Sequence, residues 1–232
     1  MDNSVSPLVG IGLYTVPEAA RLTRVPSQSI RRWIGGYTYR RAGNVRESPP
    51  VWKSQIPRTE GTVGLGFLDL MEIRFVKAFR RHGVPWSVIR LAANRACDVF
   101  MQDHPFSRQR FKTDGRSIFA EIIEPEAEAK LLDLVRNQYE FHKVVSPTLY
   151  ASLEFSSLDE AIRWYPMWPK RQIVVDPQRA FGRPIVVREG VPTAALAKAA
   201  EVEGSTEYAA KWFDVSVQSV RASIAFEREF SG

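Results

Sequence analysis

A mainly α-helical fold with small β elements, an α+β fold, is predicted by three features of the sequence. Apolar residues recur at helical spacing after residue 66, at Phe67, Leu68, Met71, Phe75 and Phe79. Short runs of β-forming residues, at 37–41 and 51–56, lie among Gly, Pro and Asn. The chain ends in an Ala-rich stretch with three residues that favour helix starts, Thr193, Ser205 and Ser216.

The N-terminal segment predicts two short helices joined by a tight turn, between about Thr15 and Ile34. Thr15 and Glu18 have the spacing of a capping box, which starts the first helix. Residues 23–26 form the turn, and Val25, Ile30 and Trp33 are spaced to pack back on the first helix. The second helix then presents four polar side chains outward, Ser27, Gln28, Arg31 and Arg32.

Those four side chains suit the major groove of DNA. Gln can pair with adenine and Arg with guanine, while Ser and further Arg residues hold phosphates. The surrounding charge favours this interpretation over an ordinary packed helix pair. Between Arg21 and Arg58 the chain carries nine basic residues against the single acid Glu47, and its formal net charge is +6. We therefore expect a helix-turn-helix that binds double-stranded DNA.

A basic hairpin, or wing, is expected after the second helix. The β-like pieces 37–41 and 51–56 flank Gly43 and Asn44, which favour a turn. Its cations are expected to contact phosphates: Arg40, Arg41, Arg46 and Lys53. Helices follow from Phe67 to about His82 and from Pro85 to about Phe100, and residues 61–66 look like a flexible hinge before them.

Three regions are expected: a DNA-binding domain at 1–100, an α+β connecting region at 101–170 and a helix-turn-helix domain at 171–232. In the connecting region we expect strands at 117–123, 143–145 and 149–155, and helices at 126–136 and 158–164. Strands at 172–175 and 185–187 should flank an Asp176-Pro177 turn. The terminal helices should form a core from Leu196, Tyr208, Trp212, Phe213, Val217, Val220, Ile224 and Phe226.

The N-terminal segment resembles the winged helix-turn-helix of MerR-type regulators. Tyr14-Thr15, Ala20-Arg21-Leu22 and Arg31-Arg32-Trp33 carry the match. Pro26 departs from the family, which usually has a capping Ser there, and the wing is longer. The resemblance implies that the hairpin at 37–58 is the wing, and it leaves as an alternative an effector-responsive transcription regulator whose residues 103–169 bind a small molecule. A homodimer is expected because paired operator half-sites mirror two-fold protein symmetry.

The C-terminal segment resembles a small domain of VapB-like antitoxins of type II toxin–antitoxin systems. Asp176-Pro177, the turn at 181–184 and Val191-Pro192-Thr193 carry that match. The two resemblances together imply a cytoplasmic, homodimeric antitoxin that represses its own operon and neutralises a PIN-like ribonuclease toxin.

The charge of the tail suggests how these tasks are divided. From Thr193 onward, four basic and six acidic residues leave a charge of −2, which is unfavourable for binding phosphates. We therefore expect toxin docking or dimerisation there, with DNA contact as the second choice. The candidate interface residues are Glu203, Glu207 and Arg221.

No enzymatic activity, cofactor, metal site or membrane partner is expected. His82, His104 and His142 lack the spacing of a zinc site, and no phosphate-binding loop is present. Glu124, Glu126 and Glu128 leave a metal nuclease as the weakest alternative. The single cysteine, Cys97, fits a reducing cytoplasm, and the chain has no run of about 20 apolar residues.

Overall fold

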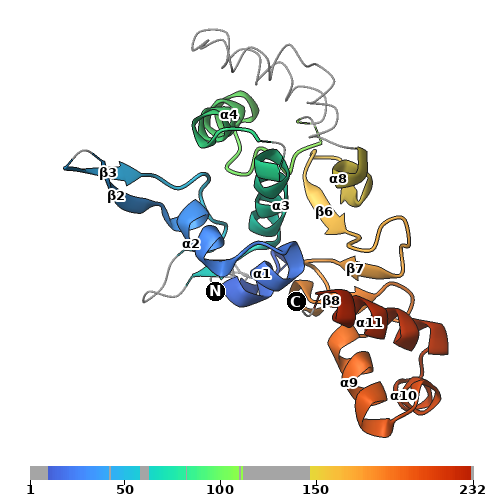
Figure 1. Cartoon of the computed structure of the whole chain (residues 1–232). Helices are drawn as coiled ribbons and strands as arrows, with labels where there is room; N and C mark the ends of the chain where they lie inside the picture. The colour runs from blue at the N-terminus through green and yellow to red at the C-terminus, as the bar shows by residue number, and fades with distance from the viewer. Residues whose placement is uncertain are drawn as a thin grey trace, which may run out of the picture.

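The computed structural model describes residues 10–41, 43–57, 63–81, 83–109, 111 and 147–230 (Figure 1). Its N-terminal elements are β1 (Tyr14–Thr15), α1 (Val16–Thr23), α2 (Ser27–Gly35), β2 (Tyr37–Arg41), β3 (Asn44–Ser48), β4 (Gly64–Leu65), α3 (Phe67–Arg81) and α4 (Trp86–Phe100). The later elements are α8 (Pro147–Ala151), β5 (Leu153–Phe155), β6 (Ala161–Trp164), β7 (Ile173–Val175), the short helix η1 (Ala180–Gly182), β8 (Pro184–Val186), α9 (Thr193–Glu203), α10 (Thr206–Phe213) and α11 (Val217–Phe230). The predicted α+β class with an N-terminal helix-turn-helix is confirmed.

The predicted capping box starts α1. The Thr15 hydroxyl accepts a hydrogen bond from the Glu18 backbone N–H, and a Glu18 carboxylate oxygen lies 2.7 Å from the Thr15 backbone nitrogen that donates to it. Arg24 then adopts a left-handed conformation (φ 54°), which ends the helix. Pro26 precedes α2, and among the described residues no side chain caps that helix.

The predicted hairpin exists, but its second strand was placed wrongly. β2 pairs antiparallel with β3, from Tyr37 opposite Ser48 to Arg41 opposite Asn44. Residues 51–56 form bends and irregular backbone instead, and Val51, Trp52 and Ile56 are buried. Gly36 makes the entry to the hairpin possible: its φ is +66°, and a Cβ there would lie 2.6 Å from the Ser48 carbonyl oxygen.

Helix α3 runs through the centre of the N-terminal half, and α4 follows it, as predicted. Met71, Phe75 and Phe79 are fully buried on α3. The expected flexible hinge at 61–66 is wrong for its described residues, since Gly64 and Leu65 form β4 and pair with β1. A strand pair fixes the entry to α3, so the chain cannot hinge there freely.

The connecting region was only partly predicted. Residues 161–164, expected to be helical, form strand β6, and helix α8 occupies the start of the expected strand at 149–155. β5, β6, β7 and β8 form one antiparallel sheet in that order, and pairing on both sides holds β6 extended. The predicted strands on both sides of Asp176-Pro177 are confirmed as β7 and β8. The elements expected at 117–123, 126–136 and 143–145 lie outside the described residues.

Three C-terminal helices form as predicted, with two corrections. Ser205 caps α10, and the Ser219 backbone N–H donates to the Ser216 hydroxyl at the start of α11. Thr193 is the first residue of α9 rather than its cap, and its hydroxyl donates to Glu227. Tyr208 and Trp212 were expected in the core but are 67% and 81% exposed, because α9 and α11 pack against the opposite face of α10.

One hydrophobic cluster extends from Tyr14 to Phe230 and includes residues of α1, α3, the four-stranded sheet and α11. Figure 1 shows α1 between the β2–β3 hairpin on one side and α11 on the other. None of the described helices is long and apolar enough to cross a membrane.

Candidate nucleic-acid interface

Helix α2 has one apolar face and one polar face. Ile30, Trp33 and Ile34 are buried, and the ring of Trp33 lies 5.4 Å from that of Trp86 on α4. The side chains predicted to meet DNA lie on the other side of the helix: Gln28, Arg31 and Arg32 are exposed and Ser27 is partly buried. The helix is therefore held by its apolar face while its polar face remains accessible.

The β2–β3 hairpin projects beyond α2 (Figure 1). Arg40 lies opposite Val45 and Arg46 opposite Tyr39 in the strand register, and all four side chains are exposed. The Arg32 guanidinium lies 5.6 Å from the centre of the Tyr37 ring, which links α2 to the hairpin. Arg41 is the last residue of β2, and its side chain lies outside the described structure.

Lys53 does not belong to the hairpin. It lies in the irregular segment that follows β3, where its ammonium group is 3.3 Å from a carboxylate oxygen of Asp103. Both side chains are largely exposed, so the ion pair is weak and leaves Lys53 accessible. Lys53 is therefore placed apart from Arg40 and Arg46.

Two members of the predicted basic cluster form ion pairs with carboxylates of the last helix. Arg21 pairs with Glu227 at 3.0 Å, and Arg24 pairs with Glu229 at the same distance. Arg24 also lies over the ring of Phe230, 4.7 Å from its centre. These contacts bind α1 to α11, so Arg21 and Arg24 contribute to internal docking as well as to the positive charge of this half.

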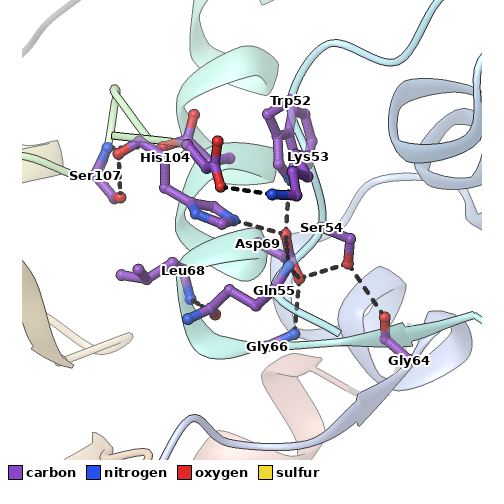
Figure 2. A network of polar contacts seen from close by, with 12 residues as sticks. Trp52, Lys53, Ser54, Gln55, Gly64, Gly66, Leu68, Asp69, His104 and Ser107 are labelled. Carbon is purple, nitrogen blue, oxygen red and sulfur yellow. Dashed lines mark hydrogen bonds and ion pairs between the residues drawn. The ribbon is translucent and has the colours of Figure 1, made fainter. Parts of the chain in front are cut away.

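A buried carboxylate, Asp69 on α3, holds the loop behind the hairpin (Figure 2). It accepts hydrogen bonds from the Trp52 indole N–H at 2.8 Å, from the Ser54 hydroxyl and from the backbone N–H of Gln55. The backbone N–H of Gly66 donates to it as well, at 2.8 Å. Asp69 is fully buried, so these donors replace the water that a charged carboxylate would otherwise require.

The network continues to a second buried carboxylate on the same helix. His104 Nε2 lies 3.0 Å from Asp69 Oδ1, and the Ser107 backbone N–H donates to Glu72 Oε1. Burial raises the pKa of Glu72 to about 7 against the opposing effects of His104 and Ser107. α3 thus organises both the loop behind the hairpin and the segment after α4.

This network was not predicted from the sequence, although one feature of the sequence indicates it. Asp69 and Glu72 interrupt the apolar face of α3 three residues apart, beside Leu68, Met71 and Phe75. Carboxylates on a buried helix face are rarely left without partners. The partners themselves come from distant segments and could not be identified by spacing.

The C-terminal candidates lie on the three C-terminal helices. Glu207 on α10 and Arg221 on α11 are brought together, with 3.3 Å between carboxylate oxygen and guanidinium nitrogen. Glu203 is exposed at the end of α9. Beside them on α10, Tyr208 and Trp212 are four residues apart and form an exposed aromatic pair on one helix face.

Known proteins resemble both the helix-turn-helix segment and most of the chain. A family model described as "Putative DNA-binding HTH domain" matches residues 12–93, from before β1 into α4. The protein named "Putative antitoxin VapB45" from Mycobacterium tuberculosis is 29% identical over 208 residues, which cover 83% of this chain and 84% of that protein. The crystal structure of Rv2018 from Mycobacterium tuberculosis superposes with a TM-score of 0.72 at 25% identity and covers 93% of this chain and 99% of that one.

The family match covers the whole helix-turn-helix, the hairpin and α3. The predicted recognition helix and hairpin both lie within it.

Proposed function

We propose that the protein is a DNA-binding antitoxin that binds its operator as a homodimer and represses its own operon. The observation that carries this is the exposed polar face of α2 beside the exposed hairpin, within the segment matched by the helix-turn-helix family. Likeness to a protein named as an antitoxin, across most of both chains, supports the antitoxin assignment.

In the proposed complex α2 enters the major groove. Gln28 and Arg31 read base edges, while Ser27 and Arg32 anchor the helix on the backbone. The hairpin contacts flanking phosphates through Arg40, Arg41 and Arg46, as the MerR-like resemblance implies, and Lys53 adds to the positive field. A two-fold dimer would place two copies of α2 on two half-sites.

The C-terminal helices are proposed to bind the toxin, a PIN-like ribonuclease. Tyr208 and Trp212 give this surface an aromatic anchor, and Glu203 and Glu207 give it an acidic margin with Arg221 nearby. Exposed aromatic side chains are typical anchors of protein interfaces. A ribonuclease must hold RNA phosphates with cations, so its surface would complement an acidic one.

The proposal is tested by co-expression with the product of the neighbouring reading frame. The full chain should relieve growth arrest by that product and co-elute with it on a sizing column. A variant carrying Tyr208→Ala and Trp212→Ala should lose both properties while retaining operator binding. The control is Leu158→Ala, another strongly exposed apolar residue, remote in sequence from α10. Growth arrest that the full chain cannot relieve would refute the antitoxin assignment.

A further inference from the structure

A cavity of about 240 Å³ lies where the N-terminal helices, the sheet and the last helix meet. The end of α1, helix α3, the residues around Trp164 and the end of α11 form its walls. Four cationic side chains line it: Arg24, Arg74, Lys77 and Arg81. None of the predicted DNA-contacting residues is among its described lining residues.

The charges around this cavity do not balance. Among the described lining residues the only carboxylate is Glu229, which is half-exposed and bound to Arg24. Arg74 lies over the Trp164 ring, 4.4 Å from its centre, and donates to the Ser152 hydroxyl. Lys77 donates to the Thr23 carbonyl oxygen at 2.8 Å. These neutral partners hold the cations in place but do not neutralise them.

The unbalanced cations oppose one another. Burial lowers the pKa of Lys77, and the positive charges of Arg81, Arg24 and Arg74 lower it further. Keeping like charges together in a partly buried site costs free energy, and a bound anion would remove that cost. Such a convergence of Arg and Lys around a cavity is the chemistry that recognises phosphate.

We propose that this cavity binds a small, freely diffusing anion that carries a phosphate group. Its volume is below the usual range for drug-sized ligands, which favours a small phosphorylated compound or phosphate itself. DNA is disfavoured as the source of the phosphate because of where the cavity lies. The hairpin is on one side of α1, whereas α11 and β6, which border the cavity, are on the other side (Figure 1). Arg24 would then contact both the anion and Glu229. Anion binding would therefore affect the Arg24–Glu229 ion pair, which joins the end of α1 to α11.

The test uses the full chain and two probes, orthophosphate and pyrophosphate. Binding is measured by isothermal titration calorimetry, with chloride added to keep the ionic strength constant. Arg81→Gln and Lys77→Gln are compared with Arg188→Gln, which removes the same charge from an exposed turn after β8. We expect at least one probe to bind, and each cavity variant to bind it about tenfold or more weakly than the control variant does.

Circular dichroism and the melting temperature establish that each variant is folded. Arg81 is exposed, so Arg81→Gln remains informative even if Lys77→Gln does not fold. The proposal would be overturned if neither probe binds the native chain, or if all three variants weaken probe binding equally. A parallel measurement of DNA binding distinguishes a small anion from DNA as the source of the phosphate. If neither probe binds, and Arg81→Gln binds all DNA more weakly than Arg188→Gln does, the four cations would instead contact the DNA backbone.

Discussion

Arg21 Nη1 lies 3.0 Å from Glu227 Oε2, and this ion pair joins the first helix of the helix-turn-helix to the last helix of the chain. Glu227 also accepts a 2.6 Å hydrogen bond from the Thr193 hydroxyl, so one carboxylate contacts both α1 and α9. Close by in sequence, Tyr14 is buried and its hydroxyl donates to the Gly182 carbonyl oxygen. The helix-turn-helix and the C-terminal helices are therefore packed against each other.

Tyr14→Phe measures the strength of this junction. The substitution removes one buried hydrogen bond and leaves the Gly182 carbonyl without its donor, so the free energy of unfolding should fall by about 1–2 kcal/mol. Urea denaturation of the full chain provides the measurement. Tyr208→Phe is the matched control, because the Tyr208 side chain is exposed. Equal effects of both changes would show that the Tyr14 hydroxyl contributes nothing specific.

Replacements on α2 and on the hairpin should affect DNA binding differently. Arg31→Ala or Gln28→Ala should reduce the preference for operator over random DNA by about 1–3 kcal/mol, because a base contact is lost. Arg40→Ala should weaken binding to both DNAs alike and reduce the salt dependence, because a phosphate contact releases counterions. Fluorescence anisotropy at several salt concentrations separates the two effects. Equal losses on both DNAs for every variant would place the recognition surface elsewhere.

Glu72 should make the stability of the protein depend on pH. Its folded-state pKa is raised to about 7, so between about pH 4.5 and 7 the folded state holds a proton that the unfolded state has released. Stability should therefore fall as pH rises through this range. From pH 5 to pH 8 the native chain should lose on the order of 2–3 kcal/mol more than Glu72→Gln, which stays neutral.

Urea denaturation of both chains at pH 5, 6, 7 and 8 tests this expectation. Other titrating groups are common to both proteins and cancel in the difference. Parallel stability profiles would show that Glu72 does not carry a proton in the folded state near neutral pH.

Trp212 and Phe226 should respond in opposite ways to truncation. Phe226 is fully buried, so Phe226→Ala should cost about 3–5 kcal/mol of stability. Trp212→Ala should change the free energy of unfolding by less than about 0.5 kcal/mol, because its side chain has few contacts to lose. Thermal and urea unfolding provide the comparison. A large loss on Trp212→Ala would mean that α10 is covered in solution, as in a dimer.

Local interactions allowed the sequence to determine most helix boundaries. The Thr15–Glu18 capping box acts across three residues. Gly83 lies just after the end of α3, and Pro85 lies just before the start of α4. The apolar spacing from Phe67 predicts the buried face of α3 for the same reason. The polar outer face of α2 follows from positions in a single helix and was also predictable.

Tertiary structure decided whatever depends on contacts with another element of the fold. Residues 161–164 are extended because β5 and β7 pair with them, and β3 rather than residues 51–56 pairs with β2. The apolar spacing of α10 cannot say which face α9 and α11 will cover, so the exposure of Trp212 was not predictable. Asp69 with Trp52, and Arg21 with Glu227, are likewise brought together only by folding, since a hydrogen bond or ion pair requires spatial proximity whatever the sequence separation.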